Sequence, residues 1–79
     1  MTTDHSTEFL PQFHRIRSIV EAALPSMSDL ERQVMIMRFA IGVDLHSLQE
    51  AGDKLGISRV EVRQTEARLL QRLLASTEP

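Results

Sequence analysis

A chain of 79 residues is long enough for one domain with a single modest hydrophobic core. Hydrophobic residues make up 42% of it and charged residues 25%, which favours a globular fold, and the absence of cysteine excludes a disulfide framework and thiolate metal sites. The formal charge of -2 argues against the broad basic surface of a nonspecific nucleic-acid binder.

The first predicted helix follows a polar N-terminal segment. Residues 1–11 offer few core candidates and are expected to be flexible. From residue 12 to residue 23, apolar residues recur at intervals of three and four, which places them on one stripe of a helix. The stripe consists of Phe13, Ile16, Ile19, Val20 and Ala23. Pro25 is expected to end this helix.

Each of the next three predicted helices is preceded by the sequence Ser-x-x-Glu. In this capping box the serine oxygen accepts a hydrogen bond from a free backbone N–H, and the glutamate accepts one from the serine N–H. The boxes are "SDLE" at 28–31, "SLQE" at 47–50 and "SRVE" at 58–61. They predict helices over residues 29–41, 48–55 and 59–74, with Gly42 and Gly56 ending the first two. A fourth match at Ser18 falls inside the first helix and is interpreted as coincidental.

The last two predicted helices have the spacing of a helix-turn-helix. A short helix, a tight turn that contains Gly56 and a longer helix with outward polar residues are typical of this unit. Ala51 suits the close crossing of the two helices. The predicted inner face is Leu48, Ala51, Leu55, Ile57, Val62, Leu69, Leu70 and Leu73. We therefore predict an all-α, four-helix domain without a wing over residues 12–75, followed by a frayed end at 76–79.

Positive charge is concentrated on the last predicted helix. Residues 58–72 hold four arginines and two glutamates, a net charge of +2, whereas residues 1–57 carry five basic and eight acidic side chains, a net charge of -3. The free N–H groups at the start of the helix also attract anions. Arginine can hydrogen-bond guanine, and glutamine adenine, through two bonds each. The pattern favours a DNA-reading helix that binds weakly and loses affinity as salt rises, although a solvated helix face is the alternative.

The sequence resembles region 4 of sigma-70 family sigma factors. The resemblance lies in "SDLERQVMIMRFAIG", "HSLQEAGDKLGIS" and "SRVEVRQTEARLLQRL", which together cover residues 28–73. It implies a four-helix fold, binding of a minus-35 promoter element by the last helix, and docking on the β-subunit flap of RNA polymerase. The DNA-binding residues expected on this basis are Ser58, Arg59, Val60, Arg63, Gln64 and Arg68.

The matched positions imply different roles for these residues. Arg59 corresponds to a base-contacting arginine and Gln64 to a polar residue that faces the bases, while Arg63 and Arg68 correspond to basic positions near phosphates. Val60 departs from the family pattern, which has a glutamate there that can accept a hydrogen bond from cytosine. Valine cannot accept one, so we expect the base preference at that position to change or weaken.

Two other positions of the same helix also depart from the family pattern. Glu61 stands where a basic residue is usual, although it is the capping-box partner of Ser58, and Thr65 replaces a larger apolar residue.

The second predicted helix has more apolar residues than one core contact needs. One side of it is formed by Leu30, Val34, Met37 and Ile41. We predict that Met35, Ile36 and Phe39 form a partner-binding surface, because methionine adapts well to partner surfaces and Ile36 stands where the family commonly has arginine. The alternative is that the first helix covers this second side.

Several functions are excluded by what the sequence lacks. It has no glycine-rich phosphate loop, no carboxylate pair of defined spacing and no nucleophile with an associated base, so no enzyme activity and no cofactor are predicted. The histidines share no ligand spacing, so no metal site is predicted. Neither an apolar run of roughly 20 residues nor a signal segment is present, so we expect a cytoplasmic protein without membrane contact.

The scarcity of aromatic residues limits the predicted role further. With no tryptophan, no tyrosine and three phenylalanines, the chain lacks the stacking platforms that hold melted promoter bases. It is therefore expected to be the minus-35 part of a two-protein sigma system, a stand-alone regulator, or a piece of a longer chain.

The leading hypothesis is a monomeric transcription regulator that binds promoter DNA and the polymerase flap, with a second sigma-like subunit or antagonist as a further partner. The alternative is an interaction module for polymerase, a sigma factor or an anti-sigma-type partner, with little DNA binding. A third reading, the C-terminal helix-turn-helix of response-regulator-like activators, fits "RQTEARLLQRL" less well, and a monomer would count against it.

Overall fold

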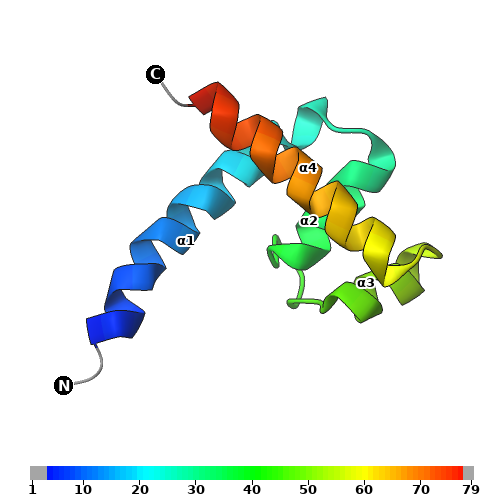
Figure 1. Cartoon of the computed structure of the whole chain (residues 1–79), viewed down its shortest axis with the longest axis horizontal. Coiled ribbons are helices and arrows are strands. Elements are labelled where there is room, and N and C mark those ends of the chain that lie inside the picture. Colours follow the sequence, from blue (N-terminus) through cyan, green and yellow to red (C-terminus); the bar gives the residue numbers. More distant parts are fainter. Residues whose placement is uncertain (1–3, 78–79) are drawn as a thin grey trace.

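All the regular secondary structure of the described residues is helical. The computed structural model describes residues 4–77, and the side chains of residues 14–76 within that range. Its elements are α1 (Asp4–Ala23), the short 3-10 helix η1 (Leu24–Ser26), α2 (Asp29–Arg38), α3 (Leu48–Leu55) and α4 (Arg59–Thr77). Helix α4 packs against each of the other three α-helices (Figure 1). The predicted all-α fold with a C-terminal helix-turn-helix is confirmed.

All three predicted capping boxes are formed. Ser28 and Glu31 exchange hydrogen bonds of 3.2 and 3.0 Å at the start of α2. The equivalent bonds measure 3.0 and 2.8 Å at the start of α3, and 3.0 and 3.2 Å at the start of α4. Because each box fixes the first turn through local contacts, α2, α3 and α4 begin at the predicted residues. The interpretation of Ser18 as an interior residue of the first helix is also confirmed.

The predicted start of the first helix and the predicted end of the last helix are both wrong. Helix α1 begins at Asp4 and runs through Pro11, well before the predicted start at residue 12. The N-terminal half of its ribbon projects beyond the other helices (Figure 1). Helix α4 continues to Thr77 instead of ending at residue 74. The predicted flexible segment (1–11) and the predicted frayed end (76–79) fall partly on residues 1–3 and 78–79, which lie outside the described residues.

Helix α2 ends at Arg38, before the predicted end at residue 41, because Ala40 adopts the left-handed conformation. Ala40 has a φ of 53°, and the N–H of Ile41 donates to the carbonyl of Ile36 at 3.0 Å. Helix α3 ends in the same way, with Gly56 at a φ of 72° and the N–H of Ile57 bonded to the carbonyl of Gly52 at 3.0 Å. Both are Schellman-type ends, in which glycine is the usual left-handed residue.

The predicted inner face of the helix-turn-helix is confirmed. Every one of its residues is buried or packs against the core. The buried apolar residues of the described chain are Val20, Met27, Val34, Met35, Phe39, Ala51, Val62 and Leu69. From the predicted stripe of α1, Val20 is buried and Ile16 and Ala23 pack against the core, whereas the side chain of Phe13 lies outside the described residues.

The prediction for α2 was wrong in detail. Met35 is fully buried and Phe39 is 7% exposed, because α3 and α4 both pack against α2 and enclose its second apolar side. Neither residue is available to a partner in this fold, while Ile36 is half-buried. Leu30, predicted to face inward, lies in the first turn of α2 and is 44% exposed.

The turn between α3 and α4 depends on a close backbone contact at Gly52. A Cβ atom at this position would lie 2.7 Å from the carbonyl oxygen of Ile57 and 3.3 Å from the carbonyl carbon of Ser58. The first distance is shorter than any ordinary van der Waals contact, and both neighbours are backbone atoms that cannot rotate away. Gly52 therefore lets the turn fold back against α3, a role that the sequence analysis gave only to Ala51.

The substitution Gly52→Ala distinguishes the effect of this contact on stability from the effect of helix propensity. Alanine is the better helix former by about 1 kcal/mol, so propensity alone predicts stabilisation. We expect the clash to outweigh it and the free energy of unfolding to fall by about 1–3 kcal/mol, the usual cost of overpacking. Urea denaturation followed by circular dichroism measures the change, with the exposed Lys54→Ala as the control on the same helix. A variant as stable as the parent would contradict the tight contact.

Ala40→Gly tests the left-handed residue after α2. An L-residue in this conformation costs about 1–2 kcal/mol, part of which the greater flexibility of unfolded glycine offsets. We expect a net stabilisation of about 0.5–1 kcal/mol in urea denaturation. Ala67→Gly is the matched control: the same substitution in the exposed interior of α4 should destabilise by about 1 kcal/mol. Loss of stability in both variants would show that Ala40 is unstrained.

Candidate nucleic-acid interface

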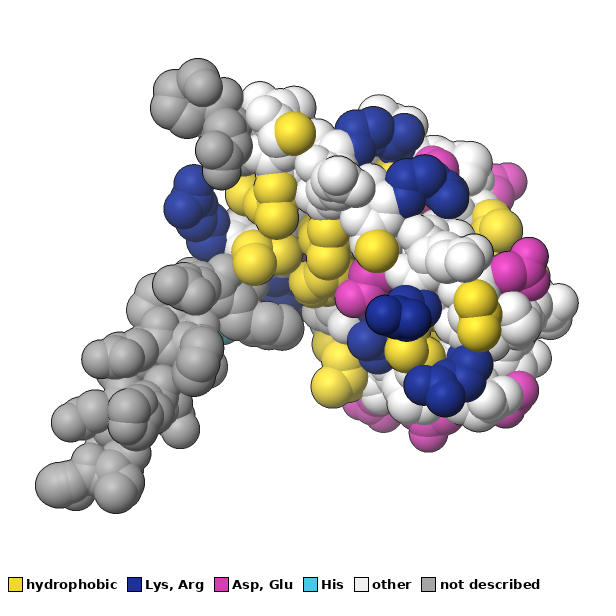
Figure 2. All heavy atoms as spheres, in the orientation of Figure 1, with side chains coloured by type: hydrophobic (Ala, Val, Ile, Leu, Met, Phe, Trp, Pro, Cys, Tyr) yellow, Lys and Arg dark blue, Asp and Glu magenta, His cyan; other side chains and the backbone are white. Residues whose placement is uncertain are grey.

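The N-terminal half of α4 presents a polar row to solvent. Arg59, Arg63 and Gln64 are exposed, and their side chains form no hydrogen bond or ion pair with another residue that the structure describes. Val60 is 53% exposed on the same stretch. Figure 2 shows basic side chains gathered over this end of α4, with hydrophobic atoms between them. The expected base-contacting residues are therefore at the surface.

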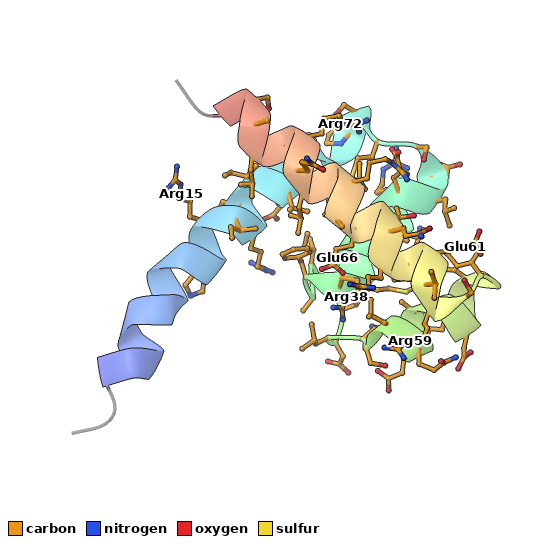
Figure 3. All side chains as sticks on the ribbon, in the orientation of Figure 1. Arg15, Arg38, Arg59, Glu61, Glu66 and Arg72 are labelled. Carbon is orange, nitrogen blue, oxygen red and sulfur yellow. The ribbon has the colours of Figure 1, made fainter. Side chains whose placement is uncertain are left out.

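Both glutamates of this helix are engaged by the protein itself. The carboxylate of Glu61 accepts the N–H of Ser58 in the capping box at 3.2 Å. Glu66 accepts a hydrogen bond of 2.6 Å from Nε of Arg38, in a largely buried ion pair between α2 and α4. Figure 3 shows Arg38 and Glu66 side by side, with Arg59 and Glu61 at the N-terminal end of α4. These contacts neutralise Glu66 and leave the positive charge of Arg59 and Arg63 uncompensated.

Three arginines outside α4 have structural roles that the sequence analysis missed. Arg17 donates to the carbonyls of Phe39 and Ala40, both at 3.1 Å, and so binds α1 to the C-terminal end of α2. Arg38, besides its bond to Glu66, donates to the carbonyl of His46 at 2.7 Å. Their partners lie 22, 23 and 8 residues away along the chain, so no local pattern identifies them.

Arg32 completes this structural set at the other end of α2. It donates to the carbonyls of Leu24 and Met27 at 3.1 and 2.9 Å and forms an ion pair with Asp29 at 2.9 Å. Three of the five arginine and lysine side chains between residues 14 and 57 therefore fasten the fold, whereas α4 presents Arg59 and Arg63 to solvent.

The start of α3 borders the basic end of α4. A shallow groove between them is lined by Arg38, Ser47, Leu48, Gln49 and Arg59. In helix-turn-helix complexes the first helix lies across the DNA backbone while the second enters the major groove. The position of this groove fits that division of roles between α3 and α4.

The family comparison agrees with this geometry. A model of the family described as Sigma-70, region 4 matches residues 23–74, which is most of the chain. The chain belongs to the Sigma-70, region 4 family. Region 4 is a DNA-binding helix-turn-helix domain of transcription factors and is not enzymatic. The match includes α2, α3 and the interface on α4, whereas nearly all of α1 precedes it.

A curated relative supports the same family. RNA polymerase sigma factor SigA4 of Synechococcus elongatus is 41% identical over 51 residues. The match covers 63% of this chain but only 16% of that sigma factor, so the chain spans a small part of its relative's length. No solved structure matches the chain.

The chain has a second surface, which is apolar and lies partly outside the residues that the family model matches. A crevice between α1 and the C-terminal end of α4 is lined by Ile19, Ala22, Ala23, Leu73 and Ser76. Figure 2 shows hydrophobic side chains open to solvent where α1 meets the C-terminal end of α4. The partner surface predicted from the sequence was placed at Met35, Ile36 and Phe39 instead, and Met35 and Phe39 are buried.

The remaining predicted site residues are at the surface with their own contacts. Ser58 belongs to the capping box, and Arg68 lies 3.8 Å from Glu31 in an exposed ion pair. Thr65 is buried, with 8% of its surface exposed, so it replaces a larger residue inside the fold and not on the interface.

No helix in residues 4–77 combines the length and apolarity that crossing a bilayer requires.

Two capping glutamates couple folding to pH. The backbone N–H of Ser28 lowers the pKa of Glu31 below its ordinary value of 4.5; Arg72 and Arg68 lower it further, against the opposing effect of desolvation. The backbone N–H of Ser47 likewise lowers the pKa of Glu50. A carboxylate whose pKa falls on folding stabilises the fold above pH 4.5 and loses this effect as the pH drops through the folded pKa.

Glu31→Gln keeps an oxygen for the cap but removes the titration. We expect a loss of about 0.5 kcal/mol at pH 7, because the negative charge at the helix start is gone. Below pH 4.5 the decline in stability should be shallower than in the parent protein. Urea denaturation between pH 7 and pH 3 measures this, and Glu21→Gln on α1 controls for the loss of one negative charge. Parallel profiles for Glu31→Gln and the parent would contradict the coupling.

Proposed function

We propose that this region 4 domain regulates transcription by reading a minus-35-like promoter element with α4 and docking on the β-subunit flap of RNA polymerase. The observation that carries the proposal is the exposed row of Arg59, Arg63 and Gln64, which has no partner among the described residues. Arginine and glutamine without internal contacts can satisfy their hydrogen bonds on DNA at little cost to the fold.

Helix geometry supports separate contacts to bases and phosphates. Arg59 and Arg63 lie one turn apart, as do Val60 and Gln64, so the four side chains form adjacent rows on the first turns of α4. The first residues of a recognition helix are those that reach base edges in the major groove. We assign Arg59 and Gln64 to bases, and Arg63 together with Arg68 to the flanking phosphates.

The apolar crevice is the proposed site for the polymerase flap. It lies at the C-terminal end of α4, whereas the basic row lies at the N-terminal end, so one contact does not obstruct the other. An apolar groove between two helices suits an amphipathic helix laid along it. A second sigma-like subunit or an antagonist is a further candidate for the same crevice.

The second candidate function is an interaction module without specific DNA binding. It is favoured by Val60 and Glu61, which replace residues that the family uses toward DNA, and by the net charge of -2. In this case the crevice is the functional surface and the basic row is a solvated face.

Parallel titrations distinguish the two functions. A fluorescent duplex with a minus-35 element and the isolated polymerase flap are each titrated with the full chain at several salt concentrations. We expect Arg59→Ala and Gln64→Ala to weaken DNA binding about 5- to 150-fold each, equivalent to about 1–3 kcal/mol. Arg63→Ala should weaken binding to the specific and to a scrambled duplex alike, and it should reduce the salt dependence of that binding.

Matched variants make the result decisive. Arg15→Ala removes an exposed arginine from α1, away from the basic row, and should leave DNA binding unchanged (Figure 3). Ala22→Glu places a charge on the exposed rim of the crevice and should abolish flap binding alone. If Arg59→Ala and Gln64→Ala bind DNA as the parent does while Ala22→Glu loses the flap, the DNA-reading role is wrong and the interaction module stands.

A further inference from the structure

Val60 is an exposed valine among hydrogen-bonding side chains. It is 53% exposed at the second position of α4, while the neighbouring Val62 is fully buried and supplies this turn's contact with the core. The fold therefore gains little from an apolar side chain at position 60. A β-branched residue is also a weaker helix former than alanine.

The surroundings of Val60 point to a ligand that is apolar at one point and polar around it. Arg59 precedes it, and Arg63 and Gln64 lie one turn further along the same side of the helix. All three are exposed, and their side chains form no hydrogen bond or ion pair within the described residues. A base edge in the major groove has this character only at thymine, whose C5 methyl group lies beside hydrogen-bonding atoms.

We propose that Val60 packs against the C5 methyl group of a thymine, so that the element read by this domain has an A·T pair at that position. The inference rests on the proposed function, since it requires α4 to lie in the major groove. Against a cytosine amine or a purine edge, valine would leave a polar group desolvated and unpaired, which disfavours those bases.

Gln64 strengthens the choice of thymine. Its amide can hydrogen-bond N6 and N7 of adenine, and its place one turn from Val60 brings it to a neighbouring position of the same groove. The two side chains together favour an A·T-containing step. The same methyl group occurs on 5-methylcytosine, which is the second possible source of the contact.

The test begins with the duplex that the protein itself prefers. The full chain selects from a random duplex pool at low salt, where phosphate contacts strengthen binding. Each thymine of the selected duplex is then replaced singly by deoxyuridine, which removes only the methyl group. We expect one replacement to weaken binding about fourfold, the effect of exposing one methyl-sized apolar group.

The same replacements are repeated with two variants of the protein. Val60→Ser removes the apolar surface, so the sensitive thymine should become insensitive to deoxyuridine. Val60→Glu should shift the selected base at that position to cytosine. If a 5-methylcytosine·guanine pair in place of the sensitive pair binds about fourfold more tightly than a cytosine·guanine pair, the methyl group is what Val60 contacts, whereas equal binding of the two pairs would contradict the methyl contact. Thermal unfolding checks that both variants fold, as expected for an exposed position.

The outcomes separate this inference from the function on which it rests. If a duplex is selected through Arg59 and Gln64 but no deoxyuridine replacement matters, or if the loss is equal in the parent and Val60→Ser, the methyl contact is wrong and the DNA-reading role stands. If no sequence is enriched even at low salt, the DNA-reading role fails together with the methyl contact.

Discussion

The close approach of Gly52 to the carbonyl of Ile57 determines where α4 can lie. With no side chain at position 52, the turn folds back onto α3, and Gly56 in the left-handed conformation directs the chain into the capping box of α4. Once this geometry is set, the inward residues of α4 meet the core and its opposite side faces solvent. The exposed row of Arg59, Arg63 and Gln64 is thus a consequence of the turn.

A net acidic chain presents a basic face because several of its charged side chains already have hydrogen-bond or ion-pair partners within the protein. Arg17, Arg32 and Arg38 donate to backbone carbonyls, which leaves fewer of their N–H groups available to a ligand. Glu66 is paired with Arg38, and the other glutamate of the α4 interface caps the helix. Net charge counts all of these residues equally, whereas the surface presents only those without internal partners. The formal charge of -2 is therefore a poor guide to this interface.

The sequence predicted what local interactions determine. Serine and glutamate three residues apart fix the starts of α2, α3 and α4, and apolar spacing identified the inner face of the helix-turn-helix. It did not predict what depends on distant partners. Phe39 directly follows a helix with apolar residues on two sides, and its burial depends on packing against parts of the chain that are distant in sequence. The end of α2 depends on Ala40, which carries no sequence signal for a left-handed turn.

In the proposed function, the two surfaces of α4 are each weak and act together. Few arginines are available to neutralise phosphates, so DNA alone holds the domain loosely and salt weakens it further. Arg59 of the basic row and Leu73 of the apolar crevice are 14 residues apart along α4, roughly 21 Å at the rise of an α-helix. A domain held on polymerase by its crevice meets promoter DNA at a high effective concentration, so modest base contacts suffice for selection. Tight DNA binding by the isolated domain is then unnecessary, and a base preference set by a few contacts on α4 is enough to distinguish promoters.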